Sequence, residues 1–106
     1  FGKRFISAGD LQWGAAMHDD LVDAVEWAVV RGVADRERIA IMGGSYGGYA
    51  ALAGLTFTPE LFACGVDIVG PSNLETLLQT IPPYWKPVVE QFYRRMGNPG
   101  TPGGLQ

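Results

Sequence analysis

The chain has 106 residues, with 8 Lys and Arg against 11 Asp and Glu, which gives a formal net charge of −3 at pH 7. This balance, without a cluster of basic residues, argues against nucleic-acid binding, and no apolar run approaches the roughly 18 residues of a membrane span. A hydrophobic content of 47% and a charged content of 18% are typical of a soluble globular domain. We therefore expect no nucleic-acid or membrane partner, no metal and no cofactor.

The single cysteine, Cys64, excludes an intrachain disulfide and weakly favours a reducing compartment, so we expect a cytoplasmic location. Because Cys64 lies in an apolar run, it is expected to be a buried small hydrophobic residue rather than a reactive thiol. The chain begins at Phe1 without an initiator Met or the apolar core of a signal peptide, which suggests a piece of a longer protein.

Residues 1–18 show no clean periodicity and are expected to form a loop with room for one helical turn. A helix follows, with Asp19 or Asp20 as its N-cap and apolar residues at three- and four-residue steps along one face. Arg31 and Gly32 predict its end, because a cation in the last turn followed by glycine is a common helix stop.

The next strand, predicted over Arg38–Met42, is continuously apolar, which is typical of a central parallel strand covered on both faces. A helix rich in small residues follows Ser45 and is expected to end near Leu55 or Phe57. A second apolar strand is predicted over Ala63–Val69. The alternation of helices and strands predicts an α/β fold with a parallel sheet and right-handed crossovers.

In the C-terminal third, Leu74–Leu78 and Val88–Met96 are predicted to be helical. A proline-broken loop at 81–87 separates them, and the glycine- and proline-rich residues 97–104 should interrupt regular structure. No internal repeat or linker divides the chain, so we expect no second domain within residues 1–106.

The strongest motif is Gly43-Gly44-Ser45-Tyr46-Gly47, which fits G-x-S-x-G, the nucleophile elbow of α/β-hydrolases. The serine of an elbow sits on a strained strand-to-helix turn, and a Cβ at the flanking glycines is expected to collide with neighbouring elements. The turn exposes the serine Oγ and places the Tyr46 N–H at a helix N-terminus, where it can stabilise an oxyanion. A glycine-rich turn with an idle serine is the alternative, but the flanking strand and helix favour the elbow.

A serine nucleophile needs a base, and the base needs an orienting acid. In α/β-hydrolases both follow the serine in the chain, yet the only histidine here, His18, precedes Ser45. We expect His18 to be a capping or surface residue. Asp67 is the only aspartate after Ser45, and it lies too early to orient a base, so a hydrogen bond to a neighbouring turn is its expected role.

The segment Gly43–Tyr49 resembles the elbow of the prolyl oligopeptidase family of serine peptidases, whose G-x-S-Y-G-G form, with Gly48, is more specific than G-x-S-x-G. The similarity extends over essentially all 106 residues. Further matching stretches are Phe1–Phe5, Trp13-Gly14 followed by Asp19–Leu21, and Asp35 with Arg38–Ile41.

The resemblance implies a partial α/β-hydrolase fold in which residues 1–106 are the N-terminal part of the peptidase catalytic domain. It implies Ser45 as the nucleophile, the Tyr46 N–H as an oxyanion donor, and Gly43, Gly44, Gly47 and Gly48 as the elbow glycines. The Tyr46 ring and the region of Val69 would line the pocket for the residue before the scissile bond. No metal is implied.

The substrates implied are short peptides or acyl-peptides. The triad Asp and His, and an N-terminal β-propeller, would lie outside this chain, so the chain alone is expected to be inactive. Two alternatives stay open: an esterase or lipase on the same fold, and a non-catalytic hydrolase-like module used for binding.

Overall fold

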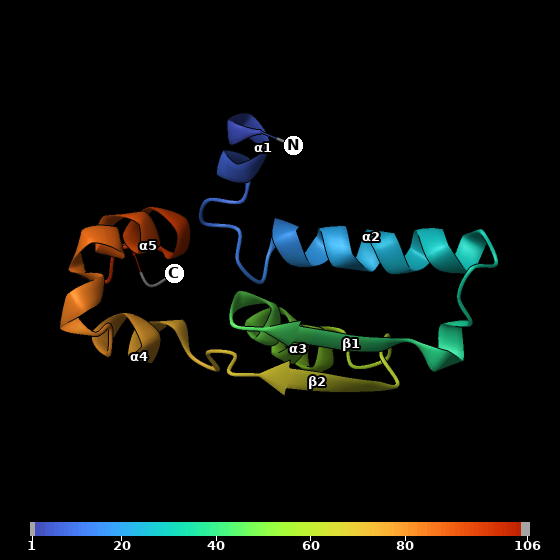
Figure 1. Ribbon diagram of the computed structural model, residues 1–106. Helices are drawn as coiled ribbons and strands as arrows, with labels where there is room; N and C mark the ends of the chain where they lie inside the picture. The colour runs from blue at the N-terminus through green and yellow to red at the C-terminus, as the bar shows by residue number, and fades with distance from the viewer. Residues whose placement is uncertain (1, 105–106) are drawn as a thin grey trace. The chain divides into compact units, whose positions relative to one another are not determined.

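The structure, a computed structural model, describes residues 2–104 (Figure 1). It contains two compact units, each described here by itself. One is formed by residues 14–72, and the other by the described parts of residues 1–13 and 73–106. No helix among residues 2–104 has the length and apolarity needed to cross a membrane.

The first unit is built on two parallel strands, β1 (Ala40–Gly44) and β2 (Cys64–Ile68), whose register pairs Ala40 with Cys64 and Gly44 with Ile68. Helix α3 (Tyr46–Phe57) joins them and packs on one face of the sheet. The strands therefore form a βαβ unit. The predicted α/β class with parallel strands and flanking helices is confirmed.

Small residues allow α3 to lie close to the sheet. Ala50, Ala51 and Ala53 of α3 are buried together with Phe62. A Cβ added at Gly54 would lie 2.9 Å from the Phe62 ring, so a larger residue would push the helix off this ring. The core of this unit thus lies between α3 and the sheet.

Within the first unit, residues 14–72, no residue covers the opposite face of the sheet. Met42 keeps 72% of its surface exposed there, and Val66 and Ile68 keep about half. Cys64 belongs to the same face and is exposed, so the prediction that it is buried is wrong for this structure. Its apolar neighbours in sequence alternate between two faces, and only one face is packed.

Helix α2 (Ala16–Val30) begins three residues before the predicted caps, and Asp19 lies in its first turn. The difference has a physical reason, because a carboxylate is favoured both at the N-cap and in the first turn of a helix. The predicted stop is confirmed: Arg31 is the C-cap, and Gly32 has a φ of 70° and donates its N–H to Val29.

A short 3₁₀ helix, η1 (Arg36–Arg38), precedes β1, so this strand begins two residues later than predicted. The Asp35 carboxylate caps η1 by accepting the Glu37 N–H at 3.1 Å. Arg36 forms an ion pair with α2: its guanidinium donates hydrogen bonds to both carboxylate oxygens of Glu26, at 2.6 and 2.7 Å.

The second unit contains α1 (Lys3–Ala8), α4 (Leu74–Gln79), η2 (Pro83–Val88) and α5 (Val89–Met96). Asn73 caps α4 by accepting the Thr76 N–H at 2.9 Å. Most of the loop predicted at 81–87 instead belongs to the 3₁₀ helix η2, which begins at Pro83. Proline is tolerated at the first position of a helix because the missing N–H has no partner there, and Pro83 occupies this position.

Candidate active site

Ser45 occupies a sharp turn between β1 and α3. Its φ of 57° and ψ of −117° lie in a region that residues with a side chain rarely adopt, and such a conformation costs about 1–3 kcal/mol. Two backbone bonds hold the turn: Ser45 N–H donates to Ile68 O at 2.9 Å, and Tyr49 N–H donates to Ser45 O at 3.1 Å. The Ser45 side chain is exposed and does not cap α3.

The elbow glycines differ in how much space surrounds them. A Cβ at Gly43 would overlap the backbone carbonyl of Gly47 and lie 2.7 Å from its Cα. At Gly44 the nearest described atom would be Ile68 O at 3.8 Å, and at Gly47 no described atom would lie within 4 Å. The expected collision is therefore present at Gly43, and in residues 2–104 it is absent at Gly44 and Gly47.

Gly48 is required by a contact between two separate segments. A Cβ on it would overlap the Asp67 carboxylate and lie 2.6 Å from the Cα of Gly70. A Cβ on Gly70 would in turn lie 2.6 Å from the Tyr49 nitrogen. The first turn of α3 and the turn after β2 thus meet backbone to backbone, which explains the second glycine of the S-Y-G-G sequence.

Tyr46 is the first residue of α3, where the intrahelical ladder does not yet use the backbone N–H groups as donors. Its hydroxyl donates to Met17 Sδ at 3.8 Å, and its ring lies 6.2 Å from that of Tyr49 at an angle of 37°. Burial raises the pKa of Tyr46, and Tyr49 raises it further. Both rings are therefore neutral phenols near pH 7.

Val69 follows β2 directly, next to the residue whose carbonyl accepts the Ser45 N–H. Its φ of 51° is a genuine outlier for a β-branched residue, and its side chain is 84% exposed. Asp67 accepts the Gly70 N–H at 2.8 Å and so orders this turn, which is the role expected for it. The structure thus brings Ser45, Tyr46 and Val69 to neighbouring strand ends.

His18 is buried, with 7% of its surface exposed, so the prediction of a capping or surface residue is wrong. Its Nε2 lies 3.3 Å from Thr58 Oγ1, and its ring meets Phe57 edge-on at 6.2 Å. The sequence carries a signal for this burial, because His18 lies three and four residues before Leu21 and Val22 on the apolar stripe of α2.

The position of His18 also excludes it as the base of Ser45. Thr58 follows the last residue of α3, whereas Ser45 precedes its first residue. A helix of 12 residues is about 18 Å long, and a base must reach its nucleophile within roughly 3 Å. Within residues 2–104, no group of three His, Cys, Asp or Glu side chains is arranged to hold a metal ion.

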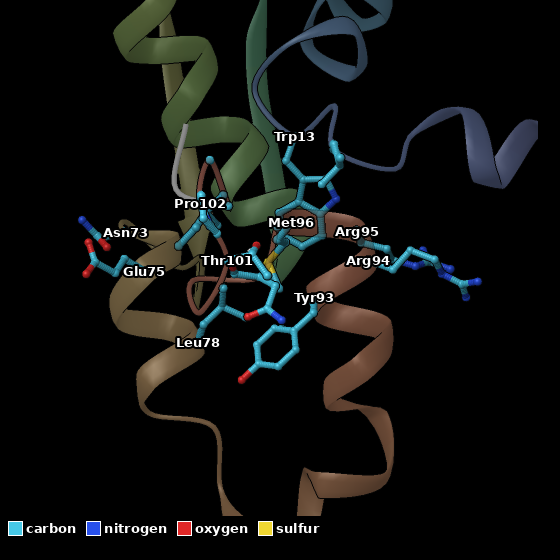
Figure 2. Close-up of a pocket in the computed structure, with 16 residues that line it drawn as sticks. Trp13, Asn73, Glu75, Leu78, Tyr93, Arg94, Arg95, Met96, Thr101 and Pro102 are labelled. Atoms are coloured by element: carbon cyan, nitrogen blue, oxygen red, sulfur yellow. Dashed lines mark hydrogen bonds between the residues drawn. The ribbon is translucent and has the colours of Figure 1, made fainter.

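A cavity of about 770 Å³ lies wholly within the second unit (Figure 2). Leu78 of α4 and Tyr93 and Met96 of α5 line it together with Trp13, Thr101 and Pro102. None of its lining residues comes from residues 14–72. No local sequence signal predicts this cavity, because it is assembled from segments far apart in the chain.

Comparison with known proteins identifies the family to which this chain is similar. A model of the prolyl oligopeptidase family matches residues 1–99. Dipeptidyl aminopeptidase BIII of Pseudoxanthomonas mexicana is 64% identical over 104 residues, which are 98% of this chain and 15% of that protein. Dipeptidyl peptidase family member 6 of Caenorhabditis elegans is 65% identical over 85 residues, or 80% of this chain and 12% of that protein.

A more distant relative, prolyl endopeptidase FAP of Mus musculus, is 36% identical over 74 residues, which cover 70% of this chain and 10% of that protein. The chain spans less than a sixth of the length of each of these three relatives. The family model, by contrast, matches nearly all residues of this chain. The chain belongs to the prolyl oligopeptidase family.

Proposed function

We propose that the full-length protein carrying this chain is a serine peptidase that hydrolyses peptide bonds of short peptides, with Ser45 as its nucleophile. The observation that carries the proposal is the conformation of Ser45, a non-glycine residue at a φ of 57° in a tight turn between β1 and α3. Strain of this kind is concentrated at functional sites, because it lowers the stability of the folded state and therefore needs another reason to be present.

In the proposed reaction the Ser45 Oγ loses its proton to the base and attacks the carbonyl carbon of the substrate to form a tetrahedral intermediate. The C–N bond of this intermediate then breaks, the amine departs with the proton, and an acyl-enzyme remains. Water then attacks the acyl-enzyme and releases the second product. The Tyr46 N–H, at the N-terminus of α3, stabilises the oxyanion of each tetrahedral intermediate. One such donor typically contributes about 3–4 kcal/mol to lowering the barrier.

We propose that the base and its orienting acid lie outside residues 1–106, because no histidine follows Ser45 in the chain and α3 separates His18 from it. The chain is then the N-terminal part of a catalytic domain, and the full-length protein also carries an N-terminal β-propeller. The single, exposed Cys64 supports a cytoplasmic location, where a thiol stays reduced.

For the substrate, we propose a peptide from which a dipeptide is released at the N-terminus. The names of the two relatives above 60% identity, a dipeptidyl aminopeptidase and a dipeptidyl peptidase, support this class. We propose that Tyr46 and Val69 line the pocket for the residue before the scissile bond, and the exposure and strained backbone of Val69 support this role.

The test is Ser45→Ala in the full-length protein, assayed with dipeptidyl arylamides. Loss of a nucleophilic serine lowers kcat by a factor of about 10⁵ or more, and we expect a loss of this size with an unchanged melting temperature. Retained turnover in the variant would overturn the assignment. If the wild type hydrolyses esters but not arylamides, the protein is better described as an esterase. If the wild type hydrolyses neither, a non-catalytic binding module is favoured.

A further inference from the structure

The ring of Tyr46 is held at its tip by a residue that belongs to a different helix. Its hydroxyl donates to Sδ of Met17, which lies in the first turn of α2, 29 residues earlier in the chain (Figure 1). Both side chains are part-buried, so this bond is partly shielded from water. The Tyr49 ring lies beside the Tyr46 ring at 6.2 Å.

Met17 itself cannot easily follow a moving ring, because the segment around it is fixed to α3 at two further places. On one side, the His18 ring contacts Phe57 and Thr58 at the end of α3. On the other, Gly14 has a φ of 70°, and a Cβ there would lie 2.5 Å from the Tyr49 hydroxyl. The start of α2, which carries Met17, is therefore held in place beside α3 where it contacts the Tyr46 hydroxyl.

The backbone of Tyr46 is held independently of its ring. The α3 hydrogen bond from Tyr49 to Ser45 and the bond from Ser45 to Ile68 fix the turn on either side of residue 46. Loss of the contact with Met17 would therefore remove the support of the ring at its hydroxyl while leaving the direction of the Tyr46 N–H unchanged. A change confined to the ring alters the shape of the substrate pocket and not the stabilisation of the oxyanion.

From this geometry we propose that Met17 is a positioning residue that sets the shape of the substrate pocket by holding the Tyr46 ring through its hydroxyl. The inference rests on the proposed function, in which this ring lines the pocket for the residue before the scissile bond. Met17 does not touch the reacting atoms. Its effect falls on KM for substrates that fill the pocket.

The experiment uses the full-length protein and dipeptidyl arylamides with a small or a large residue before the scissile bond. Met17→Leu keeps the side-chain volume and removes the acceptor, whereas Met17→Gln keeps an acceptor at similar reach. We expect Met17→Leu to raise KM about three- to fivefold for the large residue, as loss of one weak neutral hydrogen bond allows. We expect kcat to stay unchanged and Met17→Gln to restore KM.

Two further variants separate this effect from general loosening. Tyr46→Phe removes the donor, so it should also raise KM, and the double variant Met17→Leu with Tyr46→Phe should raise KM no further than Tyr46→Phe alone. Met42→Leu is the matched control, because Met42 is an exposed methionine of the same unit on the far face of the sheet, and it should leave KM unchanged.

Wild-type KM in Met17→Leu, or additive effects in the double variant, would overturn the inference. A fall in kcat with KM unchanged would do so as well. These outcomes are distinct from failure of the proposed function, which Ser45→Ala reports: if that variant is inactive and Met17→Leu is normal, only the role of Met17 is lost.

Discussion

The two ends of α3 are built in opposite ways. At the C-terminal end, Thr58 donates both its N–H and its hydroxyl to Gly54 O, at 3.2 and 2.9 Å, and the buried His18 ring lies against the hydroxyl. At the N-terminal end, Ser45 has a strained backbone and its side chain makes no capping bond. The polar groups at the C-terminal end are hydrogen-bonded to one another, whereas the Ser45 Oγ at the N-terminal end makes no hydrogen bond to α3.

This difference shows what holds each end in place. The C-terminal end is fixed by side-chain hydrogen bonds, which are individually modest and replaceable. The N-terminal end is fixed by backbone segments that touch only because Gly43, Gly48 and Gly70 have no Cβ. Side chains added at these three glycines should therefore lower activity, whereas changes at the other end should lower stability alone.

Apart from loss of the nucleophile itself, the largest effect is expected from Gly48→Ala. Its Cβ would overlap the Asp67 carboxylate and the backbone of Gly70, which must move and carry the turn after β2 with it. Overpacking of this kind costs about 3 kcal/mol, and displacement of a reacting group by roughly 1 Å can lower kcat about 100-fold. Arylamide turnover and the melting temperature of the full-length protein would measure both effects.

Gly47→Ala is the matched control, one residue away on the same helix. No described atom lies within 4 Å of a Cβ at Gly47, and alanine in a helix is favoured over glycine by about 0.5–1 kcal/mol. We expect an unchanged or slightly raised melting temperature and near-normal turnover. Equal damage by Gly47→Ala and Gly48→Ala would contradict the role assigned to the contact between Gly48 and Gly70.

A smaller effect is expected at the other end of α3, from Thr58→Val. This change removes the donor to Gly54 O and the partner of His18, at a cost of about 1–2 kcal/mol. Hydrogen exchange of α3 amides in the full-length protein would detect the loss, while kcat/KM should stay within about twofold because one hydrogen bond far from the chemistry is involved.

Thr56→Val serves as its control, since the exposed Thr56 hydroxyl bonds Leu52 O where water can replace it. Protection of α3 should then change by less than about 0.5 kcal/mol. Should Thr58→Val abolish turnover while Thr56→Val does not, the two ends of α3 would not be separable in the way proposed.

The smallest effect concerns pH. Burial raises the pKa of Tyr46 and of Tyr49, and Tyr49 raises that of Tyr46 further. A folded-state pKa above the unfolded value means that the full contribution is present below about pH 10 and is lost as the pH rises through the folded-state pKa. The urea midpoint of the full-length protein should fall in that range.

Replacing both tyrosines by phenylalanine should flatten this decline. Tyr84→Phe is the control, because Tyr84 is 77% exposed. An alkaline decline as steep in the double variant as in the wild type would contradict the assignment to Tyr46 and Tyr49.

Much of the first unit could be predicted from the sequence, because its signals are local. The elbow glycines around Ser45, the apolar run of β2 and the stop at Gly32 each specify their own conformation. The elbow also indicated the family, since Tyr46 and Gly48 narrow G-x-S-x-G to one family pattern, and the comparisons bear this out.

The predictions that were wrong concern contacts between segments far apart in the chain. The burial of His18 depends on Phe57 and Thr58, about 40 residues away, and the exposure of Cys64 depends on which face of the sheet is packed. The need for a glycine at position 48 arises from Gly70, whereas Gly47, although part of the motif, has space around it among residues 2–104. Periodicity alone carries no such information.

The central claim is that Ser45 is an activated nucleophile in the full-length protein. Its most direct test is covalent labelling with a fluorophosphonate, followed by mass spectrometry of the peptides. The account predicts one equivalent of label on the peptide that carries Ser45 and none in Ser45→Ala. A label on a different serine, with Ser45 unmodified, would contradict it.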